Sequence, residues 1–122
     1  MNIEEIRNYC LAKSGVSESF PFDENTLVFK VGNKIFLMTG LDHFPLKINL
    51  KCNPDKAIIL RENHPQITPG FHMNKKHWNT IIIDGTMRDE ILIEMINESY
   101  DLVVAKLTKK HKLELEQNQA LK

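Results

Sequence analysis

The sequence predicts an α+β domain in which helices cover one face of an antiparallel sheet. Its 122 residues, 42% hydrophobic and 26% charged, have the size and composition of one globular domain. Several short apolar runs are bounded by tight-turn signals, which is typical of antiparallel strands. Other segments carry apolar residues at three- and four-residue spacing, which is typical of helices packed on such a sheet.

The first predicted helix begins near the N-terminus. Asn2 is a suitable N-cap, and Glu5 stands three residues later at the capping-box position. Gly15 is predicted to end the helix. The inner stripe of the helix would consist of Ile3, Ile6 and Cys10.

Residues 17–24 are expected to form a loop whose two phenylalanines, Phe20 and Phe22, pack into the core. Three strands are predicted next, over residues 26–31, 34–39 and 46–51. Gly32-Asn33, between the first two strands, is a hairpin-turn signal. Side chains of the third strand alternate, so one set faces the core and the other faces away. The inward set is Leu46, Ile48 and Leu50, and the outward set is Lys47, Asn49 and Lys51.

A second helix and a fourth strand are predicted in the middle of the chain. Asn53 is the expected N-cap, Pro54 the first helical residue, and His64 the end of the helix. The apolar side of this helix would consist of Ala57, Ile58 and Leu60. Residues 65–70 are predicted to form a loop and residues 78–83 a strand.

The last predicted helix is the longest, starting at a Thr86 cap and reaching about Lys110. Its buried stripe would consist of Ile91, Leu92, Met95, Ile96, Leu102 and Val103. Its outer ridge of Glu90, Glu94 and Glu98 is typical of a solvated helix face. We therefore predict one domain over residues 1–112 and a frayed tail over residues 113–122.

Composition and charge restrict the class of function. Sixteen basic and sixteen acidic residues give no net charge, which disfavours wrapping of nucleic acid through bulk charge. Two isolated cysteines fit a reducing cytosol better than a disulfide framework. The sequence shows neither a signal-peptide pattern nor an apolar run long enough to span a bilayer. We therefore expect a cytoplasmic protein with no membrane partner.

One stretch of the sequence is locally basic. Residues 43–83 contain six basic side chains and two acidic ones, and residues 63–83 contain no acid. The segment 70–80 adds two histidines and the single tryptophan. This combination can hold an anionic or planar partner. An alternative is that the basic charges of residues 43–83 balance the acidic residues of segment 84–101 within the protein, and then no partner is needed.

Residue spacing gives little support to metal binding or catalysis. His72 and His77 are five apart, which suits shared ligation on neither a helix nor a strand. Cys52 lies at a strand-to-helix junction that could lower its pKa, but the sequence reveals no catalytic partner for it. Phosphate loops, dinucleotide fingerprints and nucleophile elbows are absent from the sequence. We expect no catalytic residue, no metal and no cofactor.

The sequence resembles the MmcQ/YjbR family of small bacterial proteins, for which DNA binding has been suggested. The resemblance runs from the first helix to about Lys110, and its most distinctive part is His-Met-Asn-Lys-Lys-His-Trp at residues 72–78. Other matching segments are residues 20–22, 28–31, 34–36, 50–54, 69–71, 79–80 and 99–103. The resemblance implies a fold similar to that of bacterial frataxin, with helices packed on an antiparallel sheet.

These observations favour a non-enzymatic DNA-binding protein that uses a basic loop and the adjacent sheet face. The predicted site consists of Lys47, Lys51, His72, Asn74, Lys75, Lys76, His77, Trp78 and Asn79. Lys75 and Lys76 would contact phosphates, and Lys47 and Lys51 would widen the patch. The asparagines and His77 would form hydrogen bonds, and Trp78 would stack on a base or brace the loop.

The expected partner is double-stranded DNA, and the expected state is a monomer or a weak homodimer. Two alternatives stay open. A small-ligand or protein-interaction module would use the same loop, with a concave pocket lined by Phe71, His72 and Trp78. An enzyme would use Cys52 or the histidines, and it would require a partner side chain within hydrogen-bond reach.

Overall fold

A six-stranded sheet and four helices make up the part of the chain that the structure describes. The computed structural model describes residues 1–70 and 73–121, with side chains described up to Gln117. The strands are β1 (Val16–Ser19), β2 (Thr26–Val31), β3 (Lys34–Gly40), β4 (Leu46–Lys51), β5 (Ile67–Pro69) and β6 (Trp78–Ile83). The helices are α1 (Ile3–Leu11), α2 (Pro54–Asn63), α3 (Asp89–Ala105) and α4 (Lys109–Leu121).

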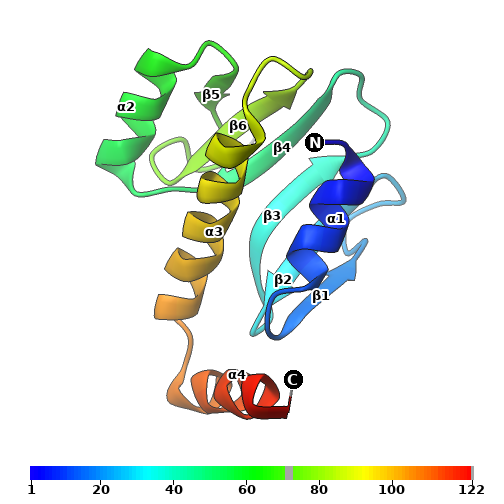
Figure 1. Cartoon of the computed structure of the whole chain (residues 1–122), viewed down its shortest axis with the longest axis vertical. Coiled ribbons are helices and arrows are strands. Elements are labelled where there is room, and N and C mark those ends of the chain that lie inside the picture. Colours follow the sequence, from blue (N-terminus) through cyan, green and yellow to red (C-terminus); the bar gives the residue numbers. More distant parts are fainter. Residues whose placement is uncertain (71–72, 122) are drawn as a thin grey trace.

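All paired strands are antiparallel, in the order β1-β2-β3-β4-β6-β5. Figure 1 shows α1 and α3 lying over the same face of this sheet, with α2 beside β5 and α4 below the end of α3. This arrangement confirms the predicted α+β fold. We call the face that points away from α1 and α3 the open face.

The core lies between the sheet and the two helices that cover it. Ile6 of α1 and Ile96 of α3 are fully buried against the strands. Ser99 ties α3 to two strands at once, because its Oγ donates to the carbonyl of Phe36 at 2.5 Å and accepts from the N–H of Lys51 at 2.9 Å. The ring of Tyr100 packs edge-on against that of Phe36, with 5.4 Å between centroids.

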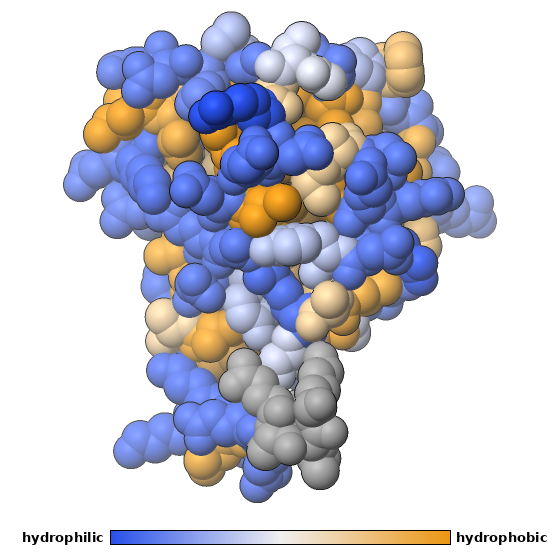
Figure 2. Space-filling model, in the orientation of Figure 1, coloured by the Kyte–Doolittle hydropathy of each residue, from blue (hydrophilic) through white to orange (hydrophobic). Residues whose placement is uncertain are grey.

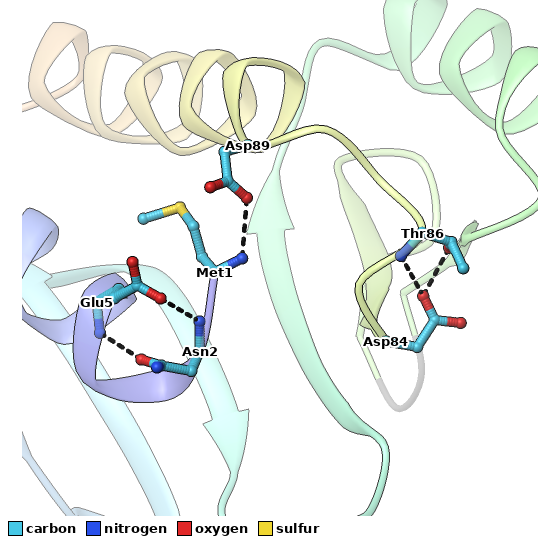
Figure 3. Close-up of polar contacts among 6 residues, drawn as sticks. All are labelled: Met1, Asn2, Glu5, Asp84, Thr86 and Asp89. Carbon is cyan, nitrogen blue, oxygen red and sulfur yellow. Dashed lines mark hydrogen bonds and ion pairs between the residues drawn. The ribbon is translucent and has the colours of Figure 1, made fainter.

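Several local predictions are confirmed. Figure 3 shows the capping box at the start of α1, in which Asn2 and Glu5 exchange side-chain-to-backbone hydrogen bonds. Gly32 and Asn33 have φ angles of 56° and 66°, the left-handed values that a type I′ hairpin turn requires. Asn53 caps α2 by accepting hydrogen bonds from the N–H groups of residues 55 and 56.

Two predicted loops contain the edge strands of the sheet. Residues 17–24 overlap β1, and residues 65–70 contain β5. Both strands are short, and β1 reads Val-Ser-Glu-Ser, with a single apolar residue. The register of an edge strand is set by pairing with its one neighbour, so its own sequence needs little apolar alternation.

The predicted last helix is two helices. The chain leaves helical geometry after Ala105, and Leu107 packs on the hairpin turn, where a Cβ at Gly32 would lie 2.6 Å from it. Thr86 is not the N-cap of α3. Its N–H and hydroxyl both donate to Asp84 (Figure 3). Arg88 occupies the cap position of α3. The predicted frayed tail is helical as far as Leu121, and Leu115 packs over Gly15.

Three apolar side chains lie outside the core that the sequence predicted for them. Phe20 and Phe22 are exposed, so their predicted role as core plugs is wrong. Ile58 of α2 is also exposed, and Ala57 is the buried residue of that helix. Figure 2 shows the resulting apolar surface over α2, on a helix-bearing face that is otherwise mostly hydrophilic.

Candidate nucleic-acid interface

The register of β4 against β6 brings the predicted lysines and the tryptophan onto one face. Lys51 is the cross-strand partner of Trp78, Asn49 of Thr80, and Lys47 of Ile82. Ile48 and Leu50, the residues between them, are buried on the opposite side, as predicted. Lys47, Asn49, Lys51 and Trp78 therefore belong to the open face by strand alternation.

Lys51 stands at the end of β4, near two other lysines. Partial burial lowers its pKa, and the positive charges of Lys106 and Lys34 lower it further. Positive charges this close together disfavour the protonated form of each lysine unless a nearby anion balances them. Lys51 thus belongs to a small cationic cluster at the end of the strand.

The turn at residues 74–77 is organised by Asn74. Its carbonyl accepts the N–H groups of His77 at 3.2 Å and Trp78 at 3.0 Å, and its side-chain oxygen accepts the N–H of Lys76 at 3.0 Å. The carbonyl of His77 accepts the N–H of Cys52 at 2.7 Å. The Asn74 oxygen that was expected to meet a partner instead shapes the turn, which presents Lys75 and Lys76 as exposed side chains.

Lys75 and Lys76 line a groove of about 400 Å³ together with Pro54, Ile58 and Arg61 of α2. We call it the basic groove. The guanidinium of Arg61 is held in place because its Nη1 donates to the carbonyl of Lys75 at 3.3 Å and to Oδ1 of Asn79 at 3.0 Å. Three cationic side chains and no carboxylate line this groove among the described residues.

Arg61 is a candidate functional residue that the predicted site lacks. Arg61 lies within the basic stretch of the sequence, but the sequence does not show that it contacts a turn 14 residues further along the chain.

Asn79 is a predicted site residue that the structure places away from the surface. Only 1% of it is exposed, and its place opposite Leu50 puts it on the helix-covered side of the sheet, where it orients Arg61. It therefore does not lie where a nucleic acid could contact it.

Two predicted elements of the site fall outside the described residues. His72 is one of the predicted DNA-binding residues, and Phe71 and His72 line the predicted alternative pocket with Trp78. Both residues lie outside the described ranges. Lys75 and Lys76 do not share a groove with Lys47 or Lys51. The predicted single patch is thus divided between the basic groove beside α2 and the open face of the sheet.

Cys52 lies in surroundings that suppress nucleophilic reactivity. It is only 6% exposed, and burial, followed by the negative charge of Glu98, raises the pKa of its thiol. A raised pKa leaves less thiolate at neutral pH. Glu98 also forms an ion pair with Lys56 at 2.9 Å, so the charge of Lys56 is already neutralised within the protein.

No group of three or more potential metal-ligating side chains gathers within residues 1–70 and 73–121.

These features define a small α+β protein built on an open six-stranded antiparallel sheet. The family model of YjbR matches residues 11–102, and the chain belongs to the YjbR family. It is 37% identical over 108 residues to the uncharacterized protein YbdF of Escherichia coli O157:H7, covering 88% of each chain. It is 33% identical over 104 residues to the uncharacterized protein YjbR of Escherichia coli K12, covering 85% of this chain and 88% of the relative.

A solved structure supports the same fold. The crystal structure of Deinococcus radiodurans protein DR2400, which has the domain DUF419, superposes with a TM-score of 0.88 at 41% identity. The match covers 94% of this chain and 88% of that protein. Within the described residues, none of the helices is long and apolar enough to cross a membrane.

Proposed function

We propose that this chain is a non-enzymatic DNA-binding protein that contacts phosphates through the basic groove. The observation that carries the proposal is the meeting of Arg61, Lys75 and Lys76 around one groove, with no carboxylate among the described residues that line it. Lysine supplies point charges to phosphate oxygens, and arginine supplies a planar fork of donors. The backbone of α2 and the 74–77 turn hold these cations close together, and no ion pair with a described carboxylate neutralises them.

The positions of the three cations favour a backbone contact over a base contact. Lys75 and Lys76 are exposed on a turn, and the Nη1 atom of Arg61 is already engaged by two protein oxygens. Such groups recognise the phosphate chain, which is common to all sequences. We therefore expect binding with little sequence preference and with a strong dependence on salt.

The experiment is a fluorescence-anisotropy titration of a labelled duplex at salt concentrations from about 50 to about 200 mM. The variant Lys75→Gln/Lys76→Gln removes two cations from the groove. If both contact phosphates, the slope of log affinity against log salt becomes shallower by about 1.8. The matched control is Lys109→Gln/Lys110→Gln, which removes two exposed lysines from α4 and is expected to retain most of the slope.

The groove proposal fails if the wild-type protein does not bind the duplex at the lowest salt concentration. It also fails if the groove variant and the α4 variant change the slope equally, because binding would then depend on net charge alone. Circular dichroism of each variant checks that the fold is intact.

A further inference from the structure

The open face contains a hollow of about 480 Å³ that the proposed phosphate contacts leave unused. It is formed by residues from five strands, β2 to β6, and from the loop that joins β3 to β4. Its volume lies in the range of small-ligand pockets. It is separate from the basic groove, since the two share no lining residue among those described.

The hollow is lined by groups that suit an anion. Lys47 supplies an ammonium group, and His43 supplies a ring that donates a hydrogen bond when neutral and carries a charge when protonated. Thr26 and Thr68 add hydroxyl groups that already donate to the carboxylate of Asp23 and to the carbonyl of Thr80, so they offer a ligand their oxygens as acceptors. No carboxylate lines the hollow among the described residues, although an oxygen of Asp42 stands nearby, 3.5 Å from where a Cβ on Gly40 would lie.

Hydrogen bonds hold the floor of the hollow in a fixed arrangement. The hydroxyl of Thr80 donates to Oδ1 of Asn49 at 2.6 Å, and Nδ2 of Asn49 donates to the carbonyl of Met38 at 3.4 Å. The hydroxyl of Thr39 donates to the carbonyl of Lys47 at 2.7 Å, which anchors the backbone that carries the ammonium group. These bonds fix the sheet surface on which a ligand in the hollow would lie.

An exposed aromatic residue stands next in the chain to His43, which lines the hollow. Phe44 directly follows His43 in the loop, and its side chain is 100% exposed. A phenyl ring left wholly in water keeps its full apolar area available to a partner. Bases that are not paired stack on such rings, whereas a duplex is read by a helix or ribbon that projects into its groove. A recess whose lining residue His43 is followed in the chain by an exposed ring therefore suits an unpaired base.

We propose that the hollow on the open face receives one unpaired nucleotide of a nucleic-acid strand, with its phosphate at Lys47 and His43 and its base on the ring of Phe44. The inference rests on the proposed function and deepens it, since it names the form of nucleic acid that binds best. Duplex DNA would use the basic groove alone, and a single strand would use the basic groove and the hollow.

The test compares a labelled single strand with the duplex of the same sequence, by anisotropy, for the wild-type protein and two variants. Lys47→Gln removes the ammonium group of the hollow, and Phe44→Ala removes the ring. The matched controls are Lys30→Gln, on β2 outside the hollow, and Phe22→Ala, another exposed phenylalanine. Nucleoside monophosphates are titrated separately by nuclear magnetic resonance.

The expected result is tighter binding of the single strand than of the duplex. Phe44→Ala weakens single-strand binding about tenfold, the loss of one stacked base, while duplex binding is unchanged. Lys47→Gln weakens single-strand binding with a shallower salt slope, and neither control has these effects.

Three results overturn the inference. Equal affinity for both forms, with no effect of either variant on single-strand binding, excludes the hollow but leaves the basic groove as the DNA site. Binding of free nucleoside monophosphates through Lys47, without binding of a strand, identifies a small-molecule site instead. Failure of the protein to bind either oligonucleotide overturns the proposed function, and this inference falls with it. Unchanged circular dichroism spectra of the variants exclude unfolding as the cause of any loss.

Discussion

Single residues decide how firmly the long helix α3 is attached to the sheet, and Ser99 forms two hydrogen bonds across this contact. It is fully buried, and its hydroxyl serves a carbonyl of β3 and an N–H of β4. Backbone groups buried without a partner are costly, so the hydroxyl matters more than its small size suggests.

Ser99→Ala is expected to destabilise the protein by about 1–3 kcal/mol, because it leaves two backbone groups without their partner. The measurement is urea unfolding followed by circular dichroism. Ser17→Ala, at an exposed position of β1, is the control and should change the free energy of unfolding by less than about 0.5 kcal/mol. Equal effects of the two substitutions would show that the hydrogen bonds of Ser99 contribute nothing net.

Cys10 and Cys52 offer a second test at this scale. Burial raises the pKa of the Cys10 thiol to about 12 and raises that of Cys52 as well. Both thiols are therefore protonated at pH 8 in the folded protein, and both are shielded from reagent. We expect iodoacetamide to label them much more slowly in the native protein than in urea, as followed by mass spectrometry. Rapid native labelling of Cys52 would restore it as a candidate nucleophile.

At the scale of elements, the joining of β5 to β6 depends on Gly70. A Cβ there would lie 2.8 Å from Cβ of Trp78 and 3.0 Å from its carbonyl oxygen. The backbone N–H of Gly70 also donates to that carbonyl at 2.9 Å, so the two segments cannot separate without losing the bond.

Gly70→Ala is expected to lower the free energy of unfolding by about 1–3 kcal/mol, the usual cost of a forced overlap. Tryptophan fluorescence should shift at the same time, because Trp78 is the single tryptophan and the contacted residue. The control is Gly85→Asn, where no described residue beyond the two chain neighbours has an atom within 4 Å of an added Cβ and asparagine tolerates the φ of +85°. A wild-type-like Gly70→Ala variant would mean that β5 moves aside at little cost.

The elements also show what the sequence could predict. The limits of β2 and β6 agree with the predicted residues 26–31 and 78–83, because both strands are apolar runs bounded by turn signals. The sequence does not predict the break between α3 and α4, since apolar spacing continues through it and the contact of Leu107 with Gly32 is visible only in the fold. Likewise, the predicted site contains the cations of the turn but lacks Arg61, because only the tertiary fold brings α2 against that turn.

For the molecule as a whole, stability against acid depends on carboxylates held by hydrogen bonds. The carboxylate of Glu18 accepts from Nη2 of Arg7 at 2.6 Å and from Nε at 2.7 Å, which ties α1 to β1. These bonds lower the pKa of Glu18 below its ordinary value of 4.5. A carboxylate whose pKa is lowered on folding stabilises the folded state at pH values above its ordinary pKa. This stabilisation is lost as the pH falls through the lowered pKa.

The free energy of unfolding should therefore decline as the pH is lowered from about 5 toward 3. Glu18→Gln should show a smaller decline over that range, since the variant has no carboxylate to protonate there. Urea unfolding at a series of pH values measures both. Glu24→Gln, an exposed change in a loop, is the control and should follow the wild-type curve. Identical curves for Glu18→Gln and wild type would show that the ion pair with Arg7 is not linked to folding.

The two outer strands of the sheet bear on how the protein behaves in a crowded solution. β5 has three residues and ends in Pro69, which lacks an N–H, and β1 carries a charged residue already paired across to α1. Short edge strands of this kind are poor templates for pairing with a strand from another molecule. Copies of the chain are therefore not expected to assemble into fibres through the edges of the sheet, and self-association would have to use the helices or the open face.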